Sequence, residues 1–246
     1  MSRREQALQS GAIPNPSTKW LEWDSKNKGL RFYNSETKTN ELIKIPLKLM
    51  FLTERSTIIG FDDNTNSRIY SNDVEFTKDE PFTVRSKAGI LVSGVYDGIK
   101  PNIISLGANY AKRVYAVLDG EIVNIVFKGD VFSQWINFTN AYKKNNPLWA
   151  NNYFVIEGAE DRKKGATKWT VPIFGWGDNL TAGEKDIANQ SYDAVDDFFI
   201  SKKVTPTTPQ QDSESDDLPS SMDFISNSPA YEPETVTVTS EDDLPF

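Results

Sequence analysis

The pattern of hydrophobic and polar positions between residues 30 and 174 is mostly that of β-strands. Short runs of β-branched and aromatic residues alternate with Asn, Asp, Gly and Ser, which favour turns. We therefore expect an antiparallel barrel or sandwich. The candidate strands are residues 30–33, 42–52, 57–61, 82–85 and 90–95.

The most clearly defined unit is a β-hairpin. Residues 113–118 and 121–127 flank Asp119-Gly120, a pair that suits the positive φ angles of a type I′ turn. Residues 131–144 have a helical pattern. Beyond that helix, residues 153–157 and 169–174 are expected to form a second hairpin around the basic loop Arg162-Lys163-Lys164-Gly165.

The sequence leaves β structure after residue 174. Thr181 and Glu184 have the spacing of a capping box, which predicts a helix from there to about residue 200. The apolar residues expected to cover the barrel are Ile187, Val195, Phe198 and Phe199. A small mainly β barrel with peripheral helices resembles the OB-fold, although the strand pattern alone does not distinguish it from an SH3-like barrel or a sandwich.

Charge and composition change near residue 204. Residues 204–246 contain none of the 27 Lys and Arg, 10 of the 35 Asp and Glu and six of the 13 Pro, so the preceding body carries 27 minus 25 charges, a net +2. Such a segment has too little apolar content to fold by itself. We expect a flexible segment at 1–17, one OB-like domain at 18–203 and a disordered acidic tail at 204–246, which is typical of an interaction tail.

The chain contains no cysteine and no histidine. This excludes disulfides, the usual zinc ligand sets and nucleophiles activated by imidazole. No apolar stretch approaches the roughly 20 residues that span a bilayer. We therefore expect a soluble, cytoplasmic protein that is not an enzyme and needs neither a metal nor another cofactor.

The last six residues, Glu241-Asp242-Asp243-Leu244-Pro245-Phe246, place acidic residues directly before an apolar end. A pocket rimmed by Lys or Arg would bury the Phe246 ring and pair its carboxylate. The hexapeptide resembles the C-terminal tip of bacterial and phage single-stranded DNA-binding proteins. That resemblance implies that replication and recombination proteins, such as a polymerase, helicase or primase, bind Asp242, Asp243, Leu244, Pro245 and Phe246.

Binding of single-stranded DNA needs cations for phosphates and flat side chains for bases. Basic and aromatic residues interleave along the predicted strands, and strand alternation places Arg113 and Tyr115 on one face. The candidate DNA-binding residues are Trp20, Trp23, Arg31, Tyr33, Arg68, Tyr70, Arg85, Lys87, Lys112, Arg113, Tyr115, Lys128, Arg162, Lys163, Lys164, Lys168 and Trp169.

A second resemblance covers most of residues 19–174. The strings Trp20-Leu-Glu-Trp23, Gly29-Leu-Arg-Phe-Tyr33, Ile69-Tyr-Ser-Asn72, Gly94-Val-Tyr-Asp-Gly-Ile-Lys100 and Phe127-Lys-Gly129 are similar to a family of tailed-phage proteins of the DNA-replication region. The family implies single-stranded DNA binding and a phage gene expressed in a bacterial cytoplasm. The body is much longer than the bacterial domain, so the bacterial tetramer is not implied and the oligomeric state stays open.

Two other functions are compatible with the sequence. The tail can mimic the host protein's tip in an interaction or inhibitor module whose body binds no DNA. A metal-dependent nuclease is the third hypothesis, and it would need carboxylates such as Asp62, Asp63 and Asp130 to converge on Mg²⁺. Asp62-Asp63 is interpreted more simply as part of a turn.

Overall fold

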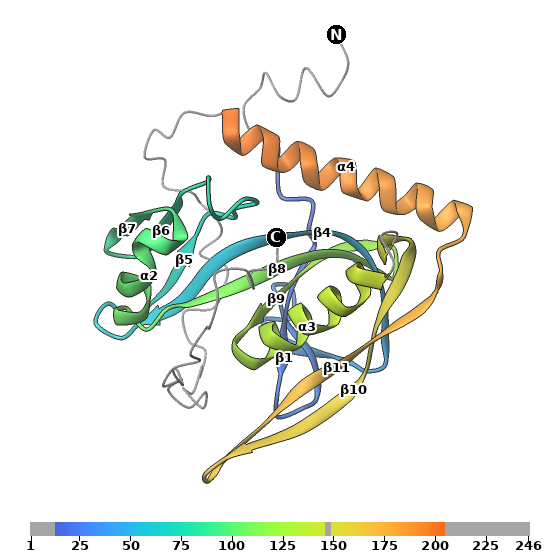
Figure 1. Ribbon diagram of the computed structural model, residues 1–246, viewed down its shortest axis with the longest axis horizontal. Helices are drawn as coiled ribbons and strands as arrows, with labels where there is room; N and C mark the ends of the chain where they lie inside the picture. The colour runs from blue at the N-terminus through green and yellow to red at the C-terminus, as the bar shows by residue number, and fades with distance from the viewer. Residues whose placement is uncertain (1–12, 146–148, 205–246) are drawn as a thin grey trace.

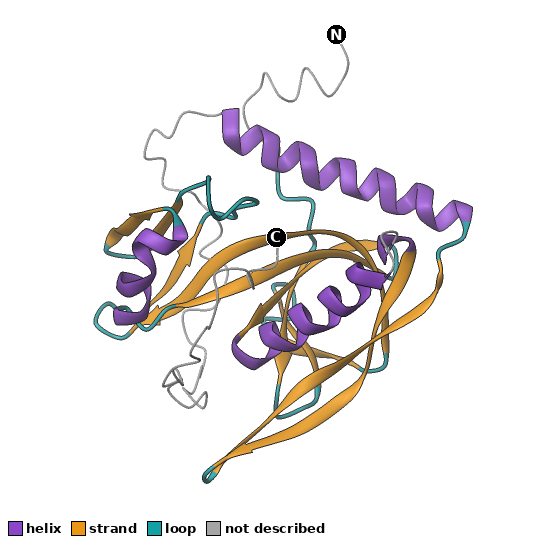
Figure 2. Ribbon diagram, in the orientation of Figure 1, coloured by secondary structure: helices purple, strands orange, loops and turns teal. Residues whose placement is uncertain are grey.

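The computed structural model describes residues 13–145 and 149–204, and the strands in these ranges form one mixed sheet with three α-helices packed on it (Figures 1 and 2). The mainly β class is thus confirmed. In chain order the elements are β1 (Lys19–Asp24), β2 (Gly29–Asn34), β3 (Thr39–Lys44), β4 (Leu47–Asp62), β5 (Ser67–Ser71), β6 (Phe82–Ser86), β7 (Gly89–Gly94), α2 (Tyr96–Ser105), β8 (Asn109–Leu118), β9 (Glu121–Lys128), α3 (Gly129–Asn145), the short 3-10 helix η1 (Trp149–Asn151), β10 (Asn152–Lys164), β11 (Thr167–Asn179) and α4 (Ala182–Val204).

The long strand β4 lies at the centre of the sheet. The strand order is β3-β2-β1-β9-β8-β4-β5-β6-β7, and β10 with its partner β11 branches from β4. β8 pairs with most of β4, from Met50↔Val117 to Ile59↔Asn109. The start of β4 also pairs with β10, and its end pairs with β5. A register shift after Phe51 interrupts the ladder with β8, as at a β-bulge, where strands bend.

The expected closed, antiparallel barrel is wrong in two respects. β1 and β9 pair in parallel, with Leu21 opposite Ile125. In the part of the chain that the structure describes, β11 pairs only with β10, so the sheet curls without closing. Side chains link β1 to β11 instead, because the Trp23 indole N–H donates to the Thr170 carbonyl at 2.8 Å.

The hairpin of β8 and β9 confirms the prediction from Asp119-Gly120. Both turn residues have positive φ, 51° and 82°, and Leu118 pairs with Glu121. The single strand expected at 42–52 is wrong. β3 ends before Pro46 and β4 begins after it, because proline has no N–H to donate to a ladder. The strand expected at 57–61 is the end of β4.

The main core lies between the curled sheet and α3. Figure 1 shows this helix lying against the sheet. The Trp135 side chain from α3 is fully buried, and its indole N–H donates to Glu54 Oε2 at 2.9 Å. Lys112 Nζ lies 3.8 Å from the other Glu54 oxygen and offsets the negative charge of this carboxylate. The aromatic rings around Trp135 are Phe51, Phe127, Phe138, Phe154 and Phe174.

Helix α4 covers part of the opposite sheet face, where Met50, Leu52 and Val117 are buried beneath it. The capping box is confirmed, since Thr181 N donates to Glu184 Oε2 at 2.8 Å and Glu184 N donates to Thr181 Oγ1 at 3.3 Å. Val195, Phe198 and Phe199 are buried as expected. The prediction for Ile187 is wrong, because this side chain is 46% exposed and is not part of the core beneath the helix.

The small lobe formed by β5, β6, β7 and α2 lies between β4 and β8 in the sequence and has its own core. Ile69, Phe82 and Val84 from its strands pack on Ile99 and Ile103 of α2. Two ion pairs tie the connection between β5 and β6 to the main sheet, Arg113 to Asp73 at 2.9 Å and Arg55 to Glu75 at 3.3 Å.

The segment expected to be flexible at 1–17 contacts the body from residue 13 onward. Ile13 packs on the α4 core, and Asn124 Nδ2 donates to Ser17 Oγ at 3.3 Å. The described domain thus begins before residue 18. Residues 1–12 and the tail from residue 205, for which we predicted disorder, lie outside the described residues.

We expect Trp135→Ala to lower the free energy of unfolding by about 3–5 kcal/mol, because it leaves a large cavity and removes a donor from Glu54. Trp20→Ala, at a half-buried position, is the matched control and should cost much less. Urea denaturation of both variants tests the difference. Equal losses would show that α3 does not anchor the core through Trp135.

Candidate nucleic-acid interface

Residues 162–169, at the end of the β10–β11 hairpin, form a projection that we call the basic arm (Figure 1). The predicted basic loop is wrong in detail, because Arg162, Lys163 and Lys164 continue strand β10. Arg162 pairs with Trp169 and Lys163 with Lys168, which leaves a two-residue turn. Gly165 opens that turn with a φ of 59°, as the first position of a type II′ turn requires.

The basic arm carries Arg162, Lys163, Lys164 and Lys168 without a carboxylate between them. Arg162 bonds Glu160 at 2.9 Å in an exposed ion pair, which is worth little. The three lysines are exposed, and no carboxylate of the described residues lies within ion-pair distance of them. Exposed cations of this kind attract phosphates without reading sequence.

The root of the basic arm is fixed to the body. The Trp169 indole N–H donates to Asp130 Oδ2 at the start of α3 over 2.7 Å. On the neighbouring residue, Thr170 Oγ1 donates to the Ser25 carbonyl at 2.8 Å. Trp169 and Trp23, both candidate DNA-binding residues, therefore serve as hydrogen-bond donors that hold the hairpin at its base.

Three other candidates share one face of β1 and β2. Glu22 of β1 pairs with Arg31 of β2, so both project from one face. Trp20 lies two residues before Glu22 and Tyr33 two residues after Arg31, so they project from the same face. Arg31 lies 3.9 Å from Glu22 and 4.0 Å from Asp24. Two carboxylates offset its charge, and this face offers half-buried aromatic rings without net positive charge.

Arg68, Tyr70 and Arg85 come together on the small lobe. Tyr70 pairs with Arg85 across β5 and β6, and Arg68 shares its face of β5. Lys87 is exposed in the turn after β6. Sequence reasoning missed Phe61, which pairs with Arg68 and is 42% exposed. Strand alternation was the available signal. It places Phe61 on the opposite side of the predicted strand from Ile58, which is buried, and from Gly60.

The candidates on β8 and β9 are mostly engaged within the protein. Arg113 and Tyr115 do share a face, but α4 lies over it, and the fully buried Tyr115 ring meets Phe199 at a centroid distance of 5.5 Å. Tyr115 therefore belongs to the core and not to an exposed surface. Arg113 pairs with Asp73 and Lys112 with Glu54. Lys128 lies at the end of β9, where its side chain is exposed and also interacts within the protein.

Two of the three acidic residues named for a nuclease, Asp62 and Asp130, have other roles. Asp62 accepts hydrogen bonds from Thr65 Oγ1 at 2.7 Å and from Asn64 N at 3.1 Å, as the turn interpretation predicts. The bond from Thr65 holds the pKa of the Asp62 carboxyl below its ordinary value. Asp130 accepts from Trp169. Across residues 13–145 and 149–204, no group of three or more metal-binding side chains converges on one point.

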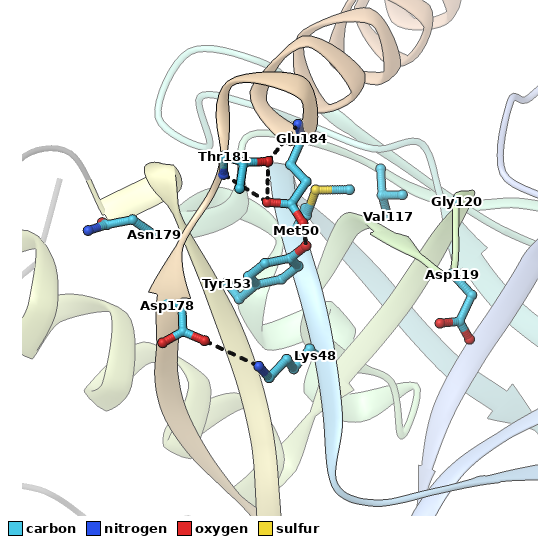
Figure 3. Close-up of a pocket in the computed structure, with 10 residues that line it drawn as sticks. All are labelled: Lys48, Met50, Val117, Asp119, Gly120, Tyr153, Asp178, Asn179, Thr181 and Glu184. Atoms are coloured by element: carbon cyan, nitrogen blue, oxygen red, sulfur yellow. Dashed lines mark hydrogen bonds and ion pairs between the residues drawn. The ribbon is translucent and has the colours of Figure 1, made fainter.

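A pocket of about 440 Å³ lies between β4, the β8–β9 turn and the start of α4 (Figure 3). Asp119, Asp178 and Glu184 line it, and Lys48 pairs with Asp178 at 3.4 Å. Three carboxylates against one lysine make it unsuitable for a phosphate. The Tyr153 hydroxyl donates to Glu184 Oε1 at 2.6 Å, and this bond raises the pKa of Tyr153 to about 12.

The same bond, together with those from Thr181, lowers the pKa of Glu184 from its ordinary value. A carboxyl whose pKa falls on folding stabilises the fold above its unfolded pKa, and this contribution is lost as the pH falls through the folded value. Glu184→Gln should therefore lower the melting temperature at pH 7, and the difference from wild type should shrink below about pH 4.5.

Thermal unfolding followed by circular dichroism between pH 3 and 7 measures this difference. Glu157→Gln, a change at an exposed carboxylate of β10, is the control and should leave the melting temperature nearly unchanged. A Glu184→Gln difference that does not vary with pH would contradict the assignment.

No family model matches this chain, and neither the curated proteins nor the solved structures include a match. None of the helices described is long and apolar enough to cross a membrane. The five C-terminal residues predicted to bind a partner, 242–246, lie outside the described residues.

Proposed function

We propose that this chain is a single-stranded DNA-binding protein that coats DNA without sequence preference and is not an enzyme. The observation that carries the proposal is the basic arm, which projects four cations and no carboxylate from a rigid root. Binding of this type needs phosphate contacts and stacking surfaces and no fixed base-reading motif.

The chain order of the central elements supports an OB-like classification. We take β4, β8, β9, β10 and β11 as the five strands, because β4 bends and pairs with both β8 and β10, and α3 stands between the third and fourth strands. OB-folds bind oligonucleotides with strands 2 and 3 and with the connections 1–2 and 4–5. Here those connections are the segment that contains the small lobe and the turn of the basic arm.

The C-terminal tip supports recruitment of other proteins to the coated strand. Phe246 follows two acidic residues and a Leu-Pro step, as in the single-stranded DNA-binding proteins that the tip resembles. We propose that a polymerase, helicase or primase of the same cell takes this tip in a pocket rimmed by basic side chains. The family resemblance to tailed-phage replication proteins is part of the same proposal.

Charge reversal of Arg162, Lys163 and Lys164 should weaken binding to oligo(dT) and make its salt dependence shallower. Each lost phosphate contact should change the slope of log affinity against log salt by about 0.7. Fluorescence titrations between about 50 and 300 mM NaCl, a range over which such contacts weaken strongly, measure both quantities.

The matched control reverses Lys44, Lys78 and Lys100, three exposed lysines outside the basic arm. This control changes the net charge by the same amount as the arm variant. Its slope of log affinity against log salt should stay steeper than that of the arm variant. Equal slopes in the two variants would remove the basic arm from the interface. Absence of saturable oligo(dT) binding by the wild type at low salt would reject the proposed function and favour the tail-mimic hypothesis.

We expect two separable roles for the tail. Its acidic residues compete with DNA phosphates for the basic side chains, and its tip binds a partner protein. Deleting residues 205–246 changes the net charge from −8 to +2, since ten acidic residues are lost, and should strengthen DNA binding at low salt. Deleting Phe246 alone leaves these acids in place, so DNA affinity should stay the same. Partner binding should fall by 2 kcal/mol or more, roughly the contribution of a buried aromatic anchor.

Paired titrations of the intact, Phe246-deleted and tail-deleted proteins against oligo(dT) and against the replication enzymes of the host test both roles. If every enzyme interaction survives loss of Phe246, the tip has no docking role. If tail deletion leaves DNA affinity at low salt unchanged, the tail does not compete with phosphates.

A further inference from the structure

The end of β4 and the strands of the small lobe share one exposed face, which combines aromatic, cationic and aliphatic side chains. Phe61 pairs with Arg68 across β4 and β5, Tyr70 pairs with Arg85 across β5 and β6, and Arg85 pairs with Ile90 of β7. Directly paired residues of antiparallel strands project from the same face. We call these five residues the aromatic platform.

The two rings of the aromatic platform are diagonal neighbours, because Tyr70 pairs with Ile59, two residues before Phe61. Diagonal positions lie about 7–8 Å apart, so the two rings stand side by side. Phe61 is 42% exposed, Tyr70 41% and Ile90 64%. Exposed apolar side chains that cluster in this way often mark a binding surface, whereas scattered ones do not.

No element of the described chain covers the aromatic platform. Ile69, Phe82 and Val84 project from the other face of these strands onto α2. On the platform side, α4 packs on earlier residues of β4, where Phe199 stacks under Arg55 at 5.0 Å, and it ends at Val204. The end of β4 and the strands of the lobe continue beyond it.

The aromatic platform carries two cationic side chains, Arg68 and Arg85, each of which also interacts with other residues of the protein. Besides its two arginines, the outward positions of these four strands hold Ile59, Thr83 and Ser93, and none of them holds a carboxylate. Asp62, at the end of β4, pairs with Ser67 and projects from the other face of the sheet. Its carboxylate accepts a hydrogen bond from Thr65 within the turn.

We propose that the aromatic platform stacks unpaired bases of a single strand while Arg68 and Arg85 contact the adjacent phosphates. The inference rests on the proposed function and deepens it by assigning base contacts to one face. Flat rings accept any base, so stacking gives no sequence preference, and a duplex, whose bases are already stacked and paired, cannot use them. The basic arm, whose lysines have no exposed ring beside them, contacts the backbone alone.

Two oligonucleotides separate base stacking from phosphate binding. One is oligo(dT) of about 20 nucleotides, longer than the 4–16 that an OB-fold covers, and the other is an abasic strand of equal length and charge. Wild type should prefer oligo(dT). The double variant Phe61→Ala, Tyr70→Ala should lose about fivefold or more in affinity for oligo(dT) and little for the abasic strand. The variant of Arg162, Lys163 and Lys164 should lose affinity for both.

Tyr192→Ala is the matched control, because Tyr192 is also 41% exposed but belongs to α4 and not to the strands of the aromatic platform. It should keep the wild-type preference, as should Tyr70→Phe, which retains the ring. If the double variant keeps the wild-type preference for oligo(dT) over the abasic strand, the aromatic platform does not stack bases. The proposed function would not be affected. A wild type that binds both strands equally would lead to the same conclusion, whereas failure to bind either strand would reject the proposed function itself.

Photocrosslinking uses the unchanged protein and does not depend on variant folding. Irradiation with an oligonucleotide that carries 5-iododeoxyuridine should give crosslinked peptides that contain Phe61 or Tyr70, identified by mass spectrometry. Crosslinks confined to other regions would overturn the proposal. So would a double variant that keeps its DNA preference but loses self-association in sedimentation experiments, since that result identifies a contact between copies.

Discussion

The pairing of β4 with β8 is the interaction on which the rest of the structure depends. β4 is buried on both faces along its first half, with Leu49 and Phe51 in the core under α3 and Met50 and Leu52 under α4. A strand in this position needs apolar residues at successive positions instead of simple alternation. The register with β8 then places both helices, the small lobe and the β10–β11 hairpin relative to one another.

The hairpin that ends in the basic arm combines a fixed base with an exposed end. Hydrogen bonds from Trp23 and Trp169 and the contact between Thr170 and Ser25 hold its root. Beyond them the two strands support only each other, and their side chains face solvent. Mutual repulsion among clustered lysines costs least where water screens them, so a projecting hairpin can carry this charge without destabilising the core.

Buried polar groups show how the sheet accommodates charge elsewhere. Glu54 accepts a hydrogen bond from the Trp135 indole N–H and lies near Lys112. Arg113 pairs with Asp73, and Arg55 pairs with Glu75. Removing the partner of a buried member, such as Arg55 or Asp73, leaves a desolvated charge, which costs more than the pair contributes. The basic and aromatic residues among them serve the architecture, so composition alone overestimates how many such side chains are open to a ligand.

Features set by neighbouring residues were predictable from the sequence. The Asp119-Gly120 turn, the helix near residues 131–144 and the Thr181–Glu184 capping box depend on backbone preferences and contacts a few residues long. The basic character of Arg162 to Lys164 was equally plain, although their place in a strand was not.

Only the tertiary structure decided which faces are open. The parallel pairing of β1 with β9, about a hundred residues away, and the open edge of the sheet arise from long-range packing that leaves no local signal. Strand alternation correctly placed Arg113 beside Tyr115 and could not reveal that α4 covers them. Phe61, Arg68, Tyr70 and Arg85 meet for the same reason, because register between strands depends on the burial of their other faces.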